Sequence, residues 1–448
     1  MDYRLLADAI AADIAEGRLR PGDRLPPQRD FAHRRGIAAS TAGRAYAELR
    51  RRGLIAGEVG RGTYVRLDPG SPAPASGEPP DGRLIDLELV VPILPEQPAI
   101  LAEVLAGVLR RPEALGAALR PVGVAADAGR REAAAAGLAR GGWRPAPEGL
   151  RFAGNGRQAL AGALAALAPP GARVGFEALT YPVAKAIAVR LGIAPVPLAM
   201  DAEGLRPDAL EAACRSGGLA AVYLQPTLHN PLGPTMPEGR RQDLAAALRR
   251  LDLIAVEDAV YAFLEASAPA PLAAFAPERV LLVDSLSKRV APGMTLGFVA
   301  APPGGLAERA GMALRTGAWS AGGLALDLGL RLLASGAVAR LEAAKREDAA
   351  ARQRIALALL AGLHTHGAET SYHLWLDLPA GWRAEAFAAA ALRADVAVTP
   401  AAAFAVGTAH APQAVRLALA APSSERLREG LEVVARLARR GPGGDALD

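Results

Sequence analysis

The run Val283-Asp284-Ser285-Leu286-Ser287-Lys288-Arg289-Val290-Ala291-Pro292-Gly293 contains one of only three lysines in this chain. The other two are Lys185 and Lys345, and the remaining 48 of the 51 basic residues are arginine. Unlike a guanidinium, an amine can form a Schiff base with an aldehyde. The apolar run before it predicts a buried strand, so Lys288 would follow a strand end, where ligands of open α/β sheets bind. On residue type alone, a solvated surface lysine is the more common case.

The length and composition indicate a globular protein of two or three domains. At 448 residues the chain exceeds what one hydrophobic core supports. The single cysteine, Cys214, excludes an internal disulfide framework and is typical of the reducing cytoplasm. Apolar runs such as 159–168 and 355–363 reach only about half of a membrane span, so no membrane partner is expected. The six histidines show no metal-ligand spacing, so no metal site is predicted.

The positive charge is concentrated at the N-terminal end. Residues 1–67 contain 13 arginines and 8 acidic residues, an excess of five, and the net charge of the whole chain is +5. The remainder of the chain is therefore balanced. A basic excess confined to one segment indicates a nucleic-acid partner for that segment.

The N-terminal segment has the spacing of three helices followed by a two-stranded hairpin. Apolar residues at positions 3, 6, 10 and 14 would share one helix face. A second helix is predicted over 28–35 and a third from 39 or 40 to about 53. The runs 54–56 and 63–65, with a glycine turn between them, predict the hairpin. Residues 68–83 contain five prolines and three glycines, which predicts a linker.

From residue 84 onward, short apolar runs alternate with alanine-rich amphipathic segments. Strands are predicted at 173–176, 220–224, 253–256 and 280–283. Because these runs are almost continuously apolar, they favour a mostly parallel sheet with helices on both faces. The runs 372–377 and 414–419 alternate in hydropathy, which predicts a smaller α+β unit near the C-terminal end.

Residues 3–66 resemble the GntR-type winged helix-turn-helix. The matching runs are 22–29 (GDRLPPQR), 36–46 (GIAASTAGRAY) and 60–65 (GRGTYV). The resemblance implies that the third helix enters the major groove of double-stranded DNA with its N-terminus first. One departure is Ala39, where the family commonly has an arginine. Contacts with DNA would come from the second and third helices and the wing, at Arg29, Ser40, Thr41, Arg44, Arg61 and Gly62.

Residues 85–437 resemble the fold-type I, pyridoxal-phosphate-dependent aminotransferases of class I. The matching runs are 154–158 (GNGRQ), 177–182 (EALTYP), 223–233 (YLQPTLHNPLG), 257–261 (EDAVY), 285–288 (SLSK) and 415–417 (VRL). An isolated Asn-Pro-x-Gly is usually only a turn. Runs in this order, each at a predicted strand end or helix start, indicate a site for pyridoxal 5'-phosphate (PLP).

The resemblance implies a role for each matching residue. Lys288 would form the Schiff base, and Asp258 would pair with the pyridinium nitrogen, which lets the ring act as an electron sink. Asn230 and Tyr261 would contact the ring oxygen, and Tyr181 would stack on the ring. A helix start and nearby side chains would hold the phosphate, namely Asn155, Gly156, Arg157, Ser285, Ser287 and Arg289.

The remaining match and the departures concern charged ligand groups. Arg416 would grip the carboxylate of a substrate or effector, which suits its planar, bidentate side chain. The family usually has a phosphate-binding arginine seven residues after the lysine, where this chain has Thr295. Arg289 is the nearest substitute in sequence. These departures imply a weaker phosphate clamp.

The order of the segments resembles the MocR family of GntR-type transcriptional regulators. The predicted boundaries are a winged-helix domain at 1–67, a linker at 68–84 and an aminotransferase-like domain at 85–448. The resemblance implies a homodimer on paired DNA half-sites. It also implies that the protein senses PLP or an amino compound through an internal aldimine on Lys288, with the ligand acting through its preference for one of two arrangements.

Two alternatives stay open from the sequence. The chain retains the residues a transaminase needs, so a working aminotransferase with an accessory DNA-binding domain is the first. A DNA-binding architectural protein with an inactive scaffold is the second, and the retention of Lys288 in so lysine-poor a chain argues against it. Because fold and motifs establish sites and not physiological roles, the enzyme question is left to experiment.

Overall fold

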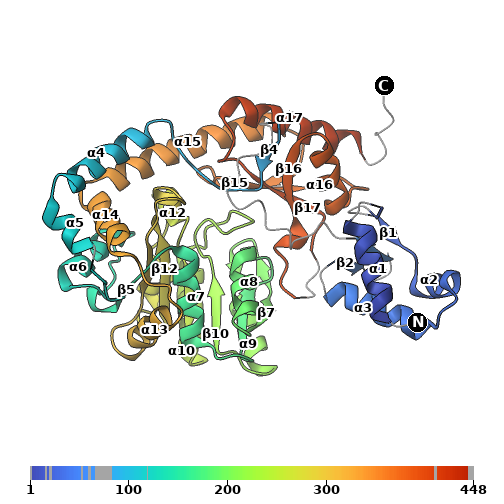
Figure 1. Cartoon of the computed structure of the whole chain (residues 1–448), viewed down its shortest axis with the longest axis horizontal. Helices are drawn as coiled ribbons and strands as arrows, with labels where there is room; N and C mark the ends of the chain where they lie inside the picture. Colours follow the sequence, from blue (N-terminus) through green and yellow to red (C-terminus); the bar gives the residue numbers. More distant parts are fainter. Residues whose placement is uncertain are drawn as a thin grey trace.

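The computed structural model describes residues 3–15, 18–19, 23–51, 54–58, 62–65, 83–118, 120–407 and 411–441 (Figure 1). Of the linker predicted at 68–84, all but residues 83 and 84 lie outside the described residues. Within the described part, no helix is long and apolar enough to cross a membrane. The same part contains no group of three His, Cys, Asp or Glu side chains that could hold a metal ion.

The N-terminal domain contains the three predicted helices and one strand more than predicted. The helices are α1 (Tyr3–Ala15), α2 (Gln28–Arg35) and α3 (Ala39–Arg51). Strands β2 (Ile55–Glu58) and β3 (Gly62–Val65) form the expected hairpin. The prediction missed a third strand, β1 (Arg24–Leu25), which pairs antiparallel with β3. A two-residue strand next to Pro26-Pro27 is too short to show alternating hydropathy.

A small apolar core holds this domain together. Leu6 and Ile10, on the predicted face of α1, are buried with Phe31 of α2 and Tyr46 of α3. The Tyr46 hydroxyl donates to the Pro26 carbonyl at 2.7 Å, so the one polar atom of that buried ring is satisfied. Gly36 ends α2 with φ 61° and ψ 35°, a left-handed conformation in which its N–H reaches the Ala32 and His33 carbonyls. That turn sets the angle between α2 and α3.

The large sheet confirms the predicted fold class. Its seven strands lie in the order β5 (Leu150–Ala153), β13 (Gly297–Ala300), β12 (Val280–Ser285), β11 (Ala255–Asp258), β10 (Ala221–Leu224), β6 (Arg173–Glu177) and β7 (Ala194–Leu198). The pairs from β12 through β7 are parallel, whereas β13 runs antiparallel to both β12 and β5. The sheet is therefore mostly parallel, and its parallel strands end at one edge.

Helices cover both faces of this sheet (Figure 1). Ala221 and Tyr223 of β10 pack in one core with α7 (Gly156–Leu167), α8 (Pro182–Arg190) and α13 (Gly305–Thr316). Val222 and Leu224 pack in another with α9 (Pro207–Arg215), α10 (Glu238–Arg250) and α14 (Gly323–Ala334). Because side chains alternate along a strand, two apolar faces require the continuous apolar runs seen in the sequence.

The smaller sheet contains the C-terminal strands and one strand from far earlier in the chain. Its order is β14 (Thr365–His366), β15 (His373–Asp377), β17 (Ala414–Ala418), β16 (Val396–Pro400) and β4 (Ile85–Leu87). Helices α16 (Ala384–Arg393) and α17 (Ser424–Arg440) pack in its core. β4 follows directly after the predicted linker and pairs in parallel with β16. The segment that leaves the DNA-binding domain is thus built into the C-terminal unit.

The long helix α15 (Ala337–Leu359) joins the two units (Figure 1). Val338 and Leu341 lie in the core of the large sheet, whereas Ala356 lies in the core of the small one. The remaining elements are α4 (Gln97–Leu109), α5 (Pro112–Ala118), α6 (Ala128–Leu138), η2 (Pro147–Gly149), β8 (Met200–Asp201), β9 (Gly204–Leu205), η3 (Ala262–Leu264), α11 (Leu272–Phe275), α12 (Leu286–Arg289) and η4 (Ala401–Ala403).

Candidate functional site

The parallel strands β10, β11 and β12 deliver polar groups to one edge of the large sheet. Asp258 is the last residue of β11, and Lys288 lies in α12, which follows β12 directly. Tyr223 is the third residue of β10 and Gln225 follows that strand. Because the three strands run in the same direction, their carboxyl ends bring these residues together.

Asp258 is buried and held by three donors. Its Oδ2 accepts from the Tyr223 hydroxyl at 2.8 Å and from Gln225 Nε2 at 3.2 Å. Its Oδ1 accepts from the Val260 amide at 3.1 Å. Burial raises the pKa of Asp258 to about 6, against the lowering effect of these hydrogen bonds. The carboxylate is therefore fixed in position and still mostly ionised at neutral pH.

Lys288 is an amine that is easily deprotonated. Burial, together with the charges of Arg157 and Arg416, lowers its pKa to about 8. An amine acts as a nucleophile only when neutral, so the lowered pKa favours covalent chemistry at this atom. Nζ donates a hydrogen bond to the backbone carbonyl of Val90.

The start of α7 lies against the hydroxyl of Ser285, which in turn contacts the hydroxyl of Ser287. Asn155 caps this twelve-residue helix, and its Oδ1 accepts from the Gln158 amide at 2.9 Å. The hydroxyls of Ser285 and Ser287 are 2.6 Å apart. A Cβ atom at Gly156 would lie 2.8 Å from Ser285 Oγ, so only glycine lets the helix start approach this closely. A helix N-terminus and two hydroxyls together suit an anion such as a phosphate.

Two tyrosines, the half-buried Tyr181 and the buried Tyr261, complete this side of the site. Burial raises the pKa of Tyr181, against the lowering effect of the nearby Arg157 guanidinium. Tyr261 is 5% exposed, and burial raises its pKa as well. Both phenols therefore stay protonated at neutral pH and are available as donors. The charge of Asp258 acts on both hydroxyls, which is consistent with one shared site.

Arg416, on β17 of the small sheet, faces the site from the other side. Nη1 donates to Asn230 Oδ1 at 3.2 Å, and Nη2 donates to Thr399 Oγ1 at 3.3 Å and to the Glu88 carbonyl. The guanidinium lies over the ring of Phe404, 5.0 Å from its centroid. Its Nε is buried without a hydrogen-bond partner. The structure thus brings Arg416 and Asn230 together, as the sequence motifs suggested.

Arg289 is engaged elsewhere. Its Nε pairs with Glu342 of α15, and its Nη2 donates to the Gly137 carbonyl of α6 at 2.8 Å. Its Nη1 lies 3.7 Å from Asp284 Oδ2. In the described part of the chain, no hydrogen bond joins Arg289 to Asn155 or the serine pair. The expected phosphate role of Arg289 therefore finds no support, because nearness in sequence does not fix which way a long side chain points.

Sequence reasoning missed four groups that shape the site. Tyr223 and Gln225 hold Asp258, and the available signal was a tyrosine inside an otherwise apolar strand. Glu88 and Val90 accept from Arg416 and Lys288 through backbone carbonyls. A backbone carbonyl leaves no trace in residue type, so nothing in the sequence could have identified these two.

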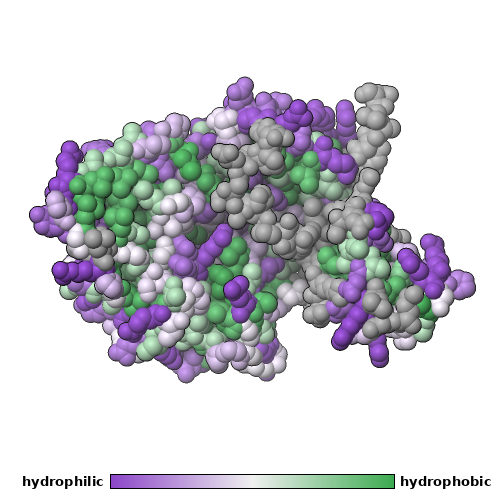
Figure 2. All heavy atoms as spheres, in the orientation of Figure 1, coloured by the Kyte–Doolittle hydropathy of each residue, from purple (hydrophilic) through white to green (hydrophobic). Residues whose placement is uncertain are grey.

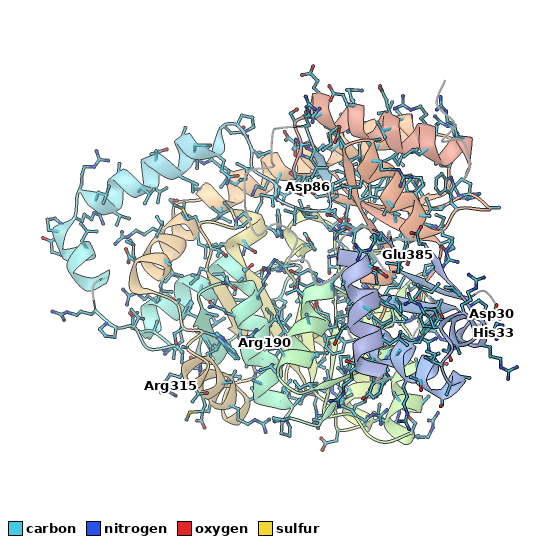
Figure 3. The ribbon with its side chains drawn as sticks, turned by 45° about the vertical axis from the view of Figure 1, so that its right-hand side comes forward. Asp30, His33, Asp86, Arg190, Arg315 and Glu385 are labelled. Atoms are coloured by element: carbon cyan, nitrogen blue, oxygen red, sulfur yellow. The ribbon has the colours of Figure 1, made fainter. Side chains whose placement is uncertain are left out.

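The predicted DNA-binding residues gather around α2 and α3. Arg29, Ser40 and Arg44 are exposed, and Thr41 is half-buried. Asp30 and His33 of α2, labelled in Figure 3, are exposed as well. Gly62 is the first residue of β3, and Arg61 lies outside the described residues. Arg29 thus stands at the start of α2, Ser40 and Thr41 stand at the start of α3, and Arg44 follows one turn further along α3. A helix-turn-helix contacts DNA with this part of the fold.

Comparison with known proteins identifies both parts of the chain. Residues 142–434 match the aminotransferase class I and II family, and residues 2–65 match the gntR family of bacterial regulatory proteins. The chain is 31% identical over 436 residues to the uncharacterized HTH-type transcriptional regulator YdeF of Bacillus subtilis, covering 97% of this chain and 94% of that protein. It is 29% identical over 296 residues to the vitamin B6 salvage pathway transcriptional repressor PtsJ of Salmonella typhimurium, covering 65% and 66%.

Among solved structures, the Pyrococcus horikoshii kynurenine aminotransferase matches with a TM-score of 0.73 at 23% identity. The match covers 81% of this chain and 92% of that one, and at this identity it shows the fold. That fold typically binds PLP. The chain therefore belongs to the MocR-type, GntR-family transcriptional regulators, which join a helix-turn-helix domain to an aminotransferase class I and II domain.

Proposed function

We propose that this regulator holds PLP at Lys288 and that occupancy of the site changes how its N-terminal domain binds DNA. The observation that carries the proposal is the convergence of three groups at one sheet edge: the Lys288 amine, the Asp258 carboxylate and the hydroxyl-lined start of α7. Each group matches a different part of PLP, namely its aldehyde, its ring nitrogen and its phosphate.

The residues present fit the cofactor. The carboxylate of Asp258, oriented by Tyr223, would pair with a protonated ring nitrogen, and that cation would hold the pKa of Asp258 down. The glycine at position 156 lets the start of α7 approach the Ser285 hydroxyl, so that backbone N–H groups and a hydroxyl could hold a phosphate together. The Thr295 hydroxyl is buried without a hydrogen-bond partner. It lies one residue before Leu296, whose carbonyl accepts from Leu286 at the start of α12. An unsatisfied hydroxyl beside the phosphate end supports a ligand there.

Bound PLP would supply an aldehyde for covalent attachment and a ring that withdraws electrons. The protein's own residues would do the rest. Lys288 offers an amine that is substantially neutral near pH 8. Arg416 offers an unpartnered Nε–H and a planar fork for a carboxylate. We therefore propose an amino compound with a carboxylate group as the second ligand of the site.

The same proposal includes a homodimer on paired half-sites of double-stranded DNA. Figure 2 shows an apolar area over α4 and α5. The exposed apolar side chains near it include Ile93 and Leu109, which is 64% exposed. An apolar surface of this kind is typical of a protein–protein interface. Two copies joined there would present two winged helices, which suits a pair of half-sites.

The relative PtsJ supports the choice of cofactor. Its name describes a repressor of a vitamin B6 salvage pathway, and PLP is the cofactor form of that vitamin. The likeness covers about two thirds of each chain. A regulator of this kind needs a site that distinguishes the presence of PLP from its absence, which Lys288 and Asp258 would provide.

DNase footprinting tests the proposal directly. The purified protein would be incubated with the DNA upstream of its own gene, with and without PLP. We expect a protected pair of similar half-sites whose protection changes with PLP. Protection that is identical in both conditions, while PLP absorbance shows that the site is loaded, would count against the regulatory link.

A working aminotransferase is the second candidate, favoured by the presence of Asp258, Tyr261, Lys288 and Arg416 around one site. Turnover requires that the cofactor stay bound after its aldehyde has become an amine. The loss of the usual phosphate-binding arginine at Thr295 weakens that hold. Repeated conversion of an amino acid to its keto acid, well beyond one equivalent per site, would favour this candidate over the regulator.

A further inference from the structure

Residues 84–94, which we call the leading segment, connect the DNA-binding domain to the aminotransferase domain. Their first residue, 84, is the last residue of the predicted linker at 68–84. They begin with β4, which pairs with β16, and the Ile85 amide donates to the Asp395 carbonyl at 2.7 Å. Asp86 Oδ1 then accepts from the amides of Glu88 and Leu89 at 2.7 and 2.9 Å. This side chain, labelled in Figure 3, fixes the turn that carries the chain out of the strand.

Two hydrogen bonds to backbone carbonyls hold this turn to the proposed ligand site. Arg416 Nη2 donates to the Glu88 carbonyl, and Lys288 Nζ donates to the Val90 carbonyl. Val90 is 5% exposed and packs in one cluster with Tyr261. Lys288, which is proposed to bind PLP, and Arg416, which is proposed to bind a carboxylate, thus contact backbone carbonyls two residues apart in the leading segment.

Occupancy of the site changes the donors that make these contacts. When the Lys288 amine attacks an aldehyde, a carbon–nitrogen double bond forms and the aldehyde oxygen leaves as water with two hydrogens. The ammonium form of Nζ carries three hydrogens, and after this reaction the nitrogen keeps at most one. A carboxylate that binds Arg416 in a bidentate manner takes two of its N–H groups, and Nη2 is already shared between Glu88 and Thr399.

We propose that the leading segment reports occupancy of the ligand site to the DNA-binding domain. Lys288 and Arg416 each hold its backbone through a side-chain hydrogen bond, and we call these two contacts the Val90 clasp and the Glu88 clasp. Covalent attachment at Lys288 breaks the hydrogen bond from Nζ to the Val90 carbonyl, which opens the Val90 clasp. A carboxylate bound to Arg416 breaks the hydrogen bond from Nη2 to the Glu88 carbonyl, which opens the Glu88 clasp. The inference rests on the proposed function, since it takes Lys288 as the point of PLP attachment.

Amide hydrogen exchange of the full-length protein tests the first clasp. The peptide covering 84–94 would be compared in wild type and Lys288→Met, each with and without PLP, and a peptide from α17 serves as the reference. In the wild type we expect PLP to speed exchange of 84–94 on the order of tenfold, the effect of losing one charge-assisted hydrogen bond. Lys288→Met should exchange at that faster rate without PLP and show no further change with it.

The outcomes separate this inference from the proposed function. Absorbance of the lysine-bound cofactor reports attachment independently of exchange. PLP could attach while the exchange rate of 84–94 stays unchanged and is the same in Lys288→Met as in the wild type. That result would overturn the inference that Lys288 holds Val90, while the proposed function would stand. If PLP does not attach, the proposed function fails. The difference between wild type and Lys288→Met without PLP then still decides whether Lys288 holds Val90.

Asp86 provides a pair of variants outside the ligand site. Asp86→Ala removes the acceptor that shapes the turn, whereas Asp86→Asn keeps an acceptor oxygen in the same place. On the DNA fragment identified by footprinting, we expect the ratio of DNA affinities with and without PLP to fall toward one in Asp86→Ala and to stay near the wild-type ratio in Asp86→Asn. Titration of PLP by absorbance should be alike in both. A wild-type ratio in Asp86→Ala would overturn the inference.

Discussion

At the scale of single residues, the few lysines stand where the structure uses an amine. Lys288 Nζ lies in a buried site, and Lys345 Nζ donates to the carbonyls of Lys288 and Val290 at 2.9 and 2.6 Å. Lys185 donates to the carbonyls of Ala403 and Ala405. A compact ammonium with three donors suits a cluster of backbone carbonyls. The composition of the chain therefore carries structural information at each of these positions.

The lowered pKa of Lys288 predicts the pH dependence of PLP attachment. Because that pKa is about 8, the neutral fraction of the amine rises with pH through 8 and then levels off. We expect the second-order rate constant for attachment to increase about tenfold from pH 7 to pH 9 and to change little above. Stopped-flow absorbance would measure it. A rate that keeps climbing to pH 10.5, as for an exposed lysine, would contradict the burial of this amine.

We predict that removing the Arg44 side chain lowers the affinity of the winged helix for DNA. The side chain is exposed on α3, so Arg44→Ala should remove one proposed DNA contact per winged helix. Each such contact contributes about 1–3 kcal/mol, so we expect at least a tenfold loss of affinity by fluorescence anisotropy. Arg315→Ala is the matched control, since Arg315 is exposed on α13 (Figure 3) and the charge change is the same. Equal losses in the two variants would show a general charge effect instead of a DNA contact.

At the scale of elements, short connections position the functional parts. The left-handed Gly36 ends α2 and lets α3 begin three residues later. In the other domain, Lys345 and Gln97 both donate to the Val290 carbonyl, which fixes the end of α12 against α15 and α4. The four-residue helix that carries Lys288 is too short to be stable alone. Its position therefore depends on these contacts from longer helices.

Replacing Gly36 by alanine should strain the backbone without creating a steric clash. A Cβ atom at Gly36 meets nothing within 4 Å, but its φ is +61°, so Gly36→Ala should destabilise the turn by about 1 kcal/mol. We expect amides of α2 and α3 to exchange about fivefold faster. Gly107→Ala is the control, since a Cβ there also meets nothing and φ is not positive. It should leave exchange in α2 and α3 unchanged.

At the scale of the whole molecule, we expect binding of the proposed ligands to stabilise the fold through the junction of the two sheets. The candidate site draws Asp258 from the large sheet, Lys288 from α12, which follows that sheet's strand β12, and Arg416 from the small sheet. The leading segment is built into the small sheet and touches both sides. A ligand that contacts both units stabilises one arrangement of them only by its difference in affinity between arrangements.

A thermal shift tests this linkage. At a PLP concentration 100 times its dissociation constant, binding stabilises the folded state by about 2.7 kcal/mol. We expect a rise in Tm in the wild type and loss of most of that rise in Lys288→Ala. Arg416→Lys should keep the rise, because it leaves the PLP contacts of Asp258 and Lys288 intact. Differential scanning calorimetry measures all three, and an equal rise in Lys288→Ala would show that covalent attachment adds nothing to binding.

The sequence by itself determined the order of the parts and the class of each. Continuous apolar runs predicted the buried strands β6, β10, β11 and β12, and spaced apolar residues predicted α1. Motifs at strand ends predicted that Asp258, Lys288 and Arg416 belong to one site. These features are local, because the residue types at a few neighbouring positions indicate burial and turns.

The tertiary structure decided which groups meet across long separations. Arg416 lies 328 residues from Glu88 in sequence, and Lys288 lies 198 residues from Val90. It also decided that Tyr223 holds Asp258, that β4 joins the C-terminal sheet and that Arg289 turns toward α6 and α15. The physical reason is that backbone carbonyls are the same in every residue and long side chains have many rotamers. Only packing selects the partner.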